Sequence, residues 1–505
     1  NMSKLVGALL LSIYLCSLVA TMQLSSLDVS GRSRSSLQAK DHHIRAQGLI
    51  LDIAALEYLT PSAEIHSFAL FADTILSLRV EEIESTTALG AKVLTGAVVS
   101  ASGAKGGTFA ISVYQGAVAA SFTLEREGKT QTYSVGGDPQ VRDAFVAHQT
   151  DNSRYLPERD IASSNQPAAE MSSPTESFQT RTTASSVTVT VDVLVGYTTN
   201  ALVEAGSRSQ MIAMLNLAIS DSTLINTNSK LSTLRFRMVG VTGPYDMEDS
   251  DIDNVLQTIR NSSTSVGAEL VPKRTAVGAD IVMMITNNAN YCGVASQMQT
   301  LSVNFKTYAF AVVKYQCAVG SYSFTHELGH VLGVTHNKGE GGPGLYSYSY
   351  GWRWGNNAYR SVMAYPPGTR LPVWSSPNVT NNGYTCGDAL DADNVKTLKI
   401  SKGTGAGWYP AAMCSGLTQA YCTDAKNPNC QWTGGACSCT SPTGCITEMT
   451  LWDMAGPPVC GNSIIEEGEK CDNGINNDDA YCSTCVKASS SASDNSSPDG
   501  FLGLC

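Results

Sequence analysis

The chain has 505 residues, 43% of them hydrophobic and 15% charged, which is enough material for about three domains with cores of their own. Its 44 aspartates and glutamates exceed its 33 lysines and arginines and give a net charge of −11. Nucleic acids and anionic membranes both select clustered lysine and arginine, so the charge argues against either partner. The charge identifies no substrate.

Residues 1–22 are expected to form a secretory signal peptide. Lys4 precedes an apolar run from Leu5 to Ala20, which is the usual order in such a segment. An uncleaved signal anchor is the alternative, because Leu18 fits poorly at the third position before a cut after Ala20. No later segment approaches ~18 continuous apolar residues. We therefore expect a secreted, extracellular protein with no stable membrane span in its mature form.

Removal of Cys16 with the signal peptide leaves fourteen of the 15 cysteines, all between Cys292 and Cys505. In an exported protein this even number predicts disulfides. In a eukaryotic host, glycosylation is also expected at three Asn-x-Ser/Thr triplets, which begin at Asn261, Asn378 and Asn495.

Residues 23–150 contain no cysteine and favour β-structure, and we interpret them as a β-rich propeptide. Runs of β-branched, aromatic and small apolar residues at Thr108–Tyr114 and Ala117–Leu124 flank Gln115-Gly116 and predict a hairpin. Further strands are expected at Phe68–Val80 and Val93–Val99.

Residues 151–186 are polar and rich in Ser, Thr, Pro, Asn and Glu, as expected of an exposed linker. The activation site of a proenzyme would lie in such a linker. No dibasic site is present, and the candidate cut points are Arg154, Arg159 and Arg181.

Residues 187–410 alternate between strand and helix patterns, which predicts an α/β layer. Strands are expected from Val187 onward and at Leu234–Val241, Ala279–Thr286 and Tyr308–Tyr315, with helices at Asn200–Ser220 and Ile252–Arg260.

The stretch Ser323–Asn337 contains the pattern H-E-x-x-H-x-x-G-x-x-H. His326 and His330, four residues apart on a helix, lie on one face and can reach one ion. His336 would lie ~9 Å beyond His330 along a continued helix, so the helix must end between them. Gly333 sits where a left-handed cap turns the chain back without a Cβ clash. The pattern therefore predicts three histidine ligands around one metal ion.

Three neutral imidazoles leave the fourth tetrahedral position of a zinc ion open, which is the pattern of a catalytic site. Glu327, beside the first ligand, is the candidate general base for water at that position. The alternative is a buried amphipathic helix with incidental histidines. Against it, the other four of the 7 histidines precede residue 150, so no other downstream histidine competes for the metal.

Beyond residue 410 the cysteines become closely spaced, and we expect two small disulfide-rich modules, at residues 411–458 and 459–505. Zinc-finger ligation is the alternative, which export and the lack of histidine disfavour. The cysteines are Cys414, Cys422, Cys430, Cys437, Cys439, Cys445, Cys460, Cys471, Cys482, Cys485 and Cys505.

The histidine pattern together with Ser361-Val-Met363-Ala-Tyr365 resembles the metzincin zinc proteases, which combine the extended motif with a downstream methionine turn. Tyr291-Cys-Gly, Cys317 and Trp374-Ser-Ser-Pro-Asn-Val-Thr are similar to the reprolysin (adamalysin) branch. The likeness is closer to bacterial-type members grouped with peptidyl-Asp metalloendopeptidases.

This resemblance covers roughly residues 187–410. It implies an α/β (α+β) catalytic domain of two lobes, with a mixed sheet, a zinc helix and substrate lying across the zinc cleft. It also implies a disulfide between Cys292 and Cys317 beside that cleft, and a structural role for Met363 at the metal site.

Two positions depart from the reprolysin pattern. Asn337 stands where reprolysins usually carry aspartate, which puts the support of the ligand loop in question. Tyr365, two residues after Met363, has the spacing at which astacins and serralysins place a tyrosine near zinc, so it either stabilises the oxyanion or only packs.

Metzincins often stay latent through a propeptide cysteine on zinc, but none lies between Cys16 and Cys292. Latency here would require steric blockage or another ligand.

The segment Cys460–Asp472 resembles the opening of disintegrin domains and also a cysteine-rich repeat of secreted microbial proteins. We expect the C-terminal modules to bind extracellular matrix or the cell surface. Acidic side chains in this region either bind Ca²⁺ through their oxygens or form a solvated loop. They are Glu466, Glu467, Glu469, Asp472 and Asp478.

The sequence therefore favours a secreted zinc metalloendopeptidase made as a proenzyme and acting on proteins or peptides. One alternative is a non-catalytic adhesion or matrix-binding protein in which the protease-like domain is a scaffold; the intact ligands and base argue against it. Another is a zinc hydrolase with a non-peptide substrate, which the long motif and the methionine turn disfavour.

Overall fold

The computed structural model describes residues 42–453, apart from 86–90, 101–102, 127–128, 140, 153, 160–186, 382, 416, 418, 424–429 and 441–448. The expected signal peptide, the cut point at Arg181 and the module at residues 459–505 lie outside the described residues. No helix in the described part of the chain is long and apolar enough to cross a membrane.

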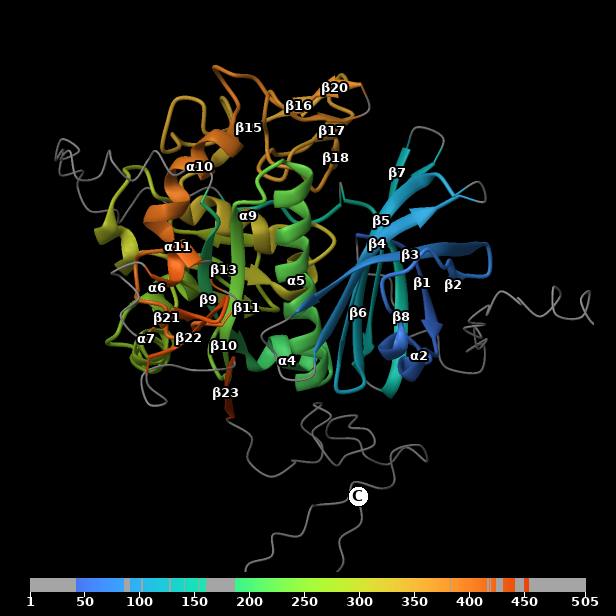
Figure 1. The fold of residues 1–505 in the computed structure, drawn as a ribbon, viewed down its shortest axis with the longest axis horizontal. Coiled ribbons are helices and arrows are strands. Elements are labelled where there is room, and N and C mark those ends of the chain that lie inside the picture. Colours follow the sequence, from blue (N-terminus) through green and yellow to red (C-terminus); the bar gives the residue numbers. More distant parts are fainter. Residues whose placement is uncertain are drawn as a thin grey trace, which may run out of the picture.

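An eight-stranded antiparallel sheet forms the N-terminal β domain, residues 42–150 (Figure 1). Its strands are β1 (His43–Leu49), β2 (His66–Phe71), β3 (Thr74–Ser85), β4 (Lys92–Val99), β5 (Lys105–Tyr114), β6 (Ala117–Arg126), β7 (Lys129–Asp138) and β8 (Val141–Thr150). Strands β2 to β8 follow one another as a meander, and β1 pairs with β8. Arg45 of β1 forms an ion pair with Asp73, in the turn between β2 and β3, so the two edges of the sheet approach each other. A short helix, α2 (Ile53–Tyr58), follows β1.

Strands β5 and β6 form the hairpin predicted around Gln115-Gly116. Both turn residues have positive φ, 46° and 81°, as a two-residue hairpin turn requires. The side chains of β5 alternate between two cores. Phe109 and Ile111 belong to the core of the N-terminal domain, whereas Ala110 packs in the core of the second domain. The sheet is thus covered on both faces.

The second domain, from residue 187, is built on a six-stranded sheet. Its strands are β9 (Val189–Thr198), β10 (Leu234–Tyr245), β11 (Ile281–Thr286), β12 (Gly293–Ala295), β13 (Phe310–Lys314) and β23 (Thr450–Asp453). They lie in the order β12-β13-β11-β9-β10-β23, and all neighbours are parallel except β12 and β13. Strands β9 and β11 are buried along their whole length, as their nearly continuous apolar runs predict. The expected mixed sheet is present, with β12 at one edge.

Helices lie on both faces of this sheet (Figure 1). They include α4 (Thr199–Ala205), α5 (Arg208–Asn228), α6 (Ile252–Arg260), α7 (Ser265–Val277) and α10 (Asn394–Gly405). Helix α5 stands between the two sheets and contacts β5, β6 and β10. The single helix predicted over Asn200–Ser220 is wrong: Gly206, with φ of 79°, ends α4, and the Ser207 side chain caps α5.

The loops around the histidine motif contain short elements. These are η2 (Val303–Thr307), α8 (Tyr315–Ala318), α9 (Ser323–Val331), β14 (Thr335–Asn337), β15 (Tyr350–Gly351), β16 (Arg353–Trp354), β17 (Tyr359–Arg360), β18 (Thr369–Arg370), β19 (Thr380–Asn381) and β20 (Tyr384–Thr385). The fully buried Trp374 anchors the last loops to α5, because its Nε1 donates to Asn226 Oδ1 at 2.7 Å.

Two disulfides, Cys414–Cys430 and Cys422–Cys437, hold the described part of the next segment. For these four cysteines the predicted disulfides are confirmed, and the alternative, zinc-finger ligation, does not apply. The segment contains α11 (Gln419–Cys422), β21 (Cys430–Thr433) and β22 (Ala436–Cys439), and its buried side chains share the core of the second domain. Cys386 departs from the expected pairing, because it is buried with no disulfide partner among the described residues.

Candidate active site

The motif helix α9 is buried along its whole length and ends at Val331. Beyond it, Gly333 has φ of 95°, a conformation that side chains with a Cβ rarely adopt. The Gly333 N–H donates to the His330 carbonyl oxygen (2.9 Å), and the Val334 N–H donates to the Gly329 carbonyl oxygen (3.1 Å). These two bonds form a Schellman turn, which reverses the direction of the chain.

The turn returns the third histidine, on β14, to the first two. The Nε2 atoms of His326, His330 and His336 lie between 3.0 and 3.1 Å from one another. His326 Nδ1 is 2.9 Å from the Val362 carbonyl oxygen, and His330 Nδ1 is 3.0 Å from the Val334 carbonyl oxygen. Because a carbonyl oxygen only accepts, both Nδ1 atoms carry the proton, and both Nε2 atoms present a lone pair.

This set of donors fits a metal ion. Lone pairs that face each other at this distance, with no proton between them, repel unless a cation lies among them. Nitrogens bound ~2.0–2.1 Å from a tetrahedral zinc are roughly 3.3 Å apart, close to the spacing of the Nε2 atoms. Burial, and after it the charge of His330, lowers the pKa of His326, which favours the neutral ring that binds metal.

Glu327 follows the first histidine and is completely buried, and neither of its carboxylate oxygens has a hydrogen-bond partner among the described residues. Burial and the negative charge of Glu158 raise the pKa of this carboxyl well above its usual value, whereas Arg370 acts in the opposite direction. The carboxylate lies against Gly293 of β12, where an added Cβ would come within 2.3 Å of Glu327 Oε1. Buried polar atoms nearly always find a partner, so these oxygens are suited to bind water or a proton.

The segment from Ser361 to Tyr365 packs against α9. The Val362 carbonyl orients His326, and Met363 is completely buried beside it. A Cβ at Gly329 would lie only 3.0 Å from the Met363 sulfur, so glycine allows the methionine to pack this close to the helix.

Asn337 connects the third histidine to this segment. Its Oδ1 accepts from the Tyr365 N–H at 3.0 Å and from Arg353 Nη2 at 3.4 Å. Asparagine can therefore support the ligand loop, as aspartate would.

The Tyr365 ring lies 3.9 Å from the His336 ring, centre to centre, and its hydroxyl donates to the Glu158 carbonyl oxygen at 3.4 Å. Its contact with an oxyanion stays a prediction.

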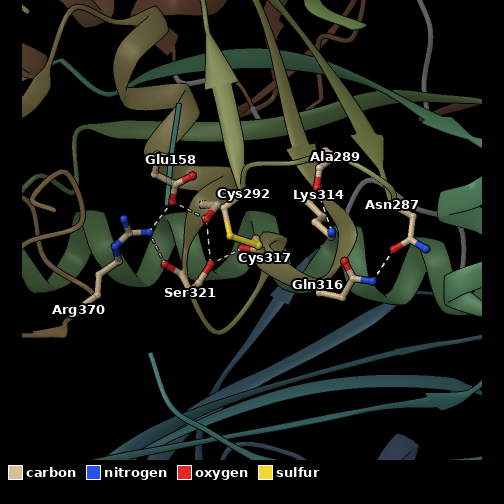
Figure 2. The surroundings of a disulfide bond; sticks show 10 residues. Glu158, Asn287, Ala289, Cys292, Lys314, Gln316, Cys317, Ser321 and Arg370 are labelled. Carbon is tan, nitrogen blue, oxygen red and sulfur yellow. Dashed lines mark hydrogen bonds and ion pairs between the residues drawn. A yellow bond between two sulfur atoms is a disulfide. The ribbon is translucent and has the colours of Figure 1, made fainter. Parts of the chain in front are cut away.

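The Cys292–Cys317 disulfide implied by the resemblance is present. It joins the residue before β12 to α8, and Figure 2 shows it beside Ser321 and Glu158. Ser321 Oγ donates to the Cys317 carbonyl oxygen (2.6 Å) and lies 2.8 Å from Ser323 Oγ, at the start of α9. The disulfide thus ties the edge strand to the turn that leads into the motif helix.

Glu158 and Arg370 complete the site, and sequence reasoning missed both. Residues from Asp151 onward were expected to form an exposed linker, but Glu158 is only 4% exposed and forms an ion pair with Arg370 Nη1 at 2.8 Å (Figure 2). Its Oε1 also accepts from Ser323 Oγ at 2.7 Å. Neither residue belongs to a motif, and no local pattern connects positions so far apart in the chain.

Comparison with known proteins agrees with this geometry. A family model described as "Metallo-peptidase family M12B Reprolysin-like" matches residues 186–392. A curated relative from Xanthomonas campestris pv. campestris, described as a peptidyl-Asp metalloendopeptidase, is 32% identical over 217 residues, which are 42% of this chain and 50% of the relative. Two relatives from Stenotrophomonas maltophilia carry the same description. One is 30% identical over 44% of this chain and 53% of its own length, and the other is 29% identical over 56% and 69%.

The chain spans about half the length of the first two of these relatives. Among solved structures, one titled "Structure of a chaperone-substrate complex" matches 44% of this chain and 36% of its own, with a TM-score of 0.36 and 18% identity. That similarity is too low to support a structural argument. The family match spans the histidine motif, the methionine turn and the edge strand beside them. Residues 186–392 are therefore similar to the reprolysin-like metallopeptidases.

Proposed function

We propose that this protein is a secreted zinc endopeptidase made as a proenzyme, with the N-terminal β domain as its propeptide. One observation carries the proposal: three imidazole Nε2 atoms converge within 3.1 Å of one another, and the residue after the first histidine carries a buried carboxylate with no hydrogen-bond partner among the described residues. This is the arrangement that zinc-dependent hydrolysis requires.

His326, His330 and His336 would hold the zinc ion through Nε2. When bound, zinc supplies a Lewis acid for the scissile carbonyl and lowers the pKa of water toward ~7. Glu327 takes a proton from the attacking water on a carboxylate oxygen and then delivers it to the leaving amine. The carbonyl oxygens of Val362 and Val334 keep two of the rings in the tautomer that presents Nε2.

The relatives are described as acting at an aspartyl residue, and we extend this preference to the present chain as part of the proposal. Proteins and peptides with accessible acidic side chains would then be its substrates. The buried guanidinium of Arg370, near Glu327, supports this choice.

Replacement of the proposed base tests the mechanism. Glu327→Ala should retain one zinc ion per chain but lose casein hydrolysis by about 10²- to 10⁴-fold, because proton transfer is removed while the ligands remain. Zinc content is measured by atomic absorption, and hydrolysis with and without a chelator.

The matched control is Glu269→Gln, which alters an exposed carboxylate of helix α7. This variant should keep most of the activity. Normal casein hydrolysis by purified Glu327→Ala would contradict the proposed mechanism.

A further inference from the structure

Residues 157–159 lie along the outer edge of β12. The Cys292 N–H donates to the Pro157 carbonyl oxygen, and the Arg159 N–H donates to the Gly293 carbonyl oxygen, both at 2.9 Å. Gly293 also touches the Glu327 carboxylate, so this edge borders the proposed base. Addition of an extended segment to a sheet edge is a common mode of peptide recognition. Residues 157–159 therefore occupy a place where a peptide substrate could bind.

The Glu158 side chain enters a buried pocket in which one of its carboxylate oxygens is bound. Its Oε1 lies 2.8 Å from Arg370 Nη1 and 2.7 Å from Ser323 Oγ. Arg370 Nη1 also donates to the Ser321 carbonyl oxygen at 2.9 Å, which fixes the guanidinium toward the carboxylate. Glu158 and Arg370 are each 4% exposed. Figure 2 shows the two side chains pointing toward each other.

The pocket also has unfilled room. A cavity of about 150 Å³ adjoins Glu158 and is lined by Arg360, Arg370 and Tyr365, among others. Tyr365 connects the pocket to the proposed metal site, because its ring lies 3.9 Å from the His336 ring, centre to centre.

The charges show why this pocket needs an anion. Arg360 and Arg370 place two guanidinium groups beside the cavity, and both side chains are buried. Glu158 supplies the compensating charge for Arg370, but it comes from the segment that precedes the second domain. If this segment leaves, Arg370 loses its ion-pair partner. A carboxylate on an incoming peptide restores the pair.

We propose that the pocket formed by Arg370, Ser321 and Ser323 selects an acidic side chain of the peptide substrate, and that Glu158 fills this pocket in the intact chain. The inference rests on the proposed endopeptidase function. Residues 157–159 then block the cleft as a substrate-like plug, which provides latency without a cysteine on the metal. Arg370 is the specificity-determining residue.

Peptide binding tests the proposal without turnover. The full chain carries Glu327→Gln, is loaded with zinc, and has the recognition sequence of a specific protease inserted between residues 165 and 180. It is studied intact and after cutting, with both parts kept in solution. Two fluorescent peptides that differ only in one aspartate or asparagine are titrated, and their anisotropy gives the dissociation constants.

The intact parent should bind neither peptide measurably. Glu158→Ala, after cutting, should bind the aspartate peptide at least about tenfold more tightly than the asparagine peptide, because only the former pairs with Arg370. Addition of Arg370→Gln should abolish this difference, and Arg370→Lys should leave an intermediate one. Arg154→Gln, an exposed change in the same segment, is the matched control and should behave like the parent.

Three results would overturn the proposal. They are equal affinity of cut Glu158→Ala for the two peptides, equal binding by the intact parent and by Glu158→Ala, and no binding of either peptide to any form. Zinc content and melting temperature verify that each variant is folded. Casein hydrolysis by the cut Glu158→Ala chain with Glu327 restored tests the proposed function separately. Its absence contradicts that function, whereas hydrolysis without discrimination between the peptides contradicts only the inference about Arg370.

Discussion

At the scale of single residues, Gly293 determines whether Glu327 can occupy its position. An added Cβ would lie 2.3 Å from Glu327 Oε1 and 2.8 Å from its Cγ and Cδ. Real Cβ atoms do not approach other atoms so closely, so either the carboxylate or the edge strand must move. Gly293 is also part of β12, which the Cys292–Cys317 disulfide holds in place.

We therefore expect Gly293→Ala to lower peptidase activity by about 10²-fold while zinc binding is kept, because a shift of about 1 Å in a catalytic group has effects of this size. The measurements are casein hydrolysis and zinc content. Gly403→Ala is the matched control, since it lies in helix α10 with nothing within 4 Å of its added Cβ. Equal activities of the two variants would show that Gly293 does not position the base.

The residues of the site differ in how far they could be predicted from sequence. His326, Glu327, His330, Gly333 and His336 lie within eleven positions, so helix geometry alone constrains their arrangement. Their backbone support comes from Val362, 36 residues beyond His326. Such contacts depend on how distant segments pack, and no local period in the sequence records that packing.

At the scale of elements, the Schellman turn after α9 connects two parts of the proposed metal site. Gly333 has φ of 95°, and an added Cβ there would lie 2.8 Å from Leu345 Cβ and 2.9 Å from the Met298 carbonyl oxygen. Two costs therefore act on any substitution: backbone strain and a steric clash. Both would move β14, which carries the third histidine.

Gly333→Ala should weaken zinc binding and destabilise the fold by roughly 1–3 kcal/mol from backbone strain, with the clash adding to this. Zinc affinity by competition with a chelator, and thermal unfolding with and without zinc, measure the two effects. Gly339→Ala separates them, because Gly339 has φ of 88° but nothing within 4 Å of an added Cβ. If both variants kept the parent's zinc affinity, the turn would not control the third ligand.

Elements with a clear local signal were predicted with accurate bounds, whereas others were not. Ile252–Arg260 has apolar residues on one face, and α6 has the predicted bounds. Helix α5 lies between two sheets and is buried on most sides, so its sequence lacks a polar stripe that would mark its ends. Helix α7 was missed because Pro272 lies inside it, and proline usually argues against a helix interior.

At the scale of the whole molecule, a half-buried carboxyl group, Glu84, and a buried one, Asp221, lie where the N-terminal β domain meets α5. Ser220 Oγ of α5 donates to Glu84 of β3 at 3.0 Å, and Ser121 Oγ of β6 donates to Asp221 of α5 at 3.2 Å. Burial, and after it the charge of Glu82, raises the pKa of Glu84 to about 7. Burial and the charge of Glu84 raise the pKa of Asp221 to about 7, against the effect of its Ser121 bond. Tyr322 also faces Asp221, and burial raises the pKa of its hydroxyl.

These pKa values predict that the contact between the two domains weakens as pH rises. Both carboxyls bind protons more tightly in the folded protein than in the unfolded chain, so their contribution to stability is complete below about pH 4 and is lost as pH rises through about 7. Thermal unfolding of the full chain at pH 5 to 8 should show a falling midpoint, by roughly 2–4 °C for each kcal/mol lost. In the double variant Glu84→Gln with Asp221→Asn, the fall in the unfolding midpoint should be much smaller, because neither amide ionises. The control is Glu125→Gln, an exposed change in β6, which should keep the parent's pH dependence. The same fall of the midpoint in all three proteins would show that other groups cause the pH dependence. Loss of the fall only in the double variant would assign the pH dependence to Glu84 and Asp221, at the contact between the N-terminal domain and α5.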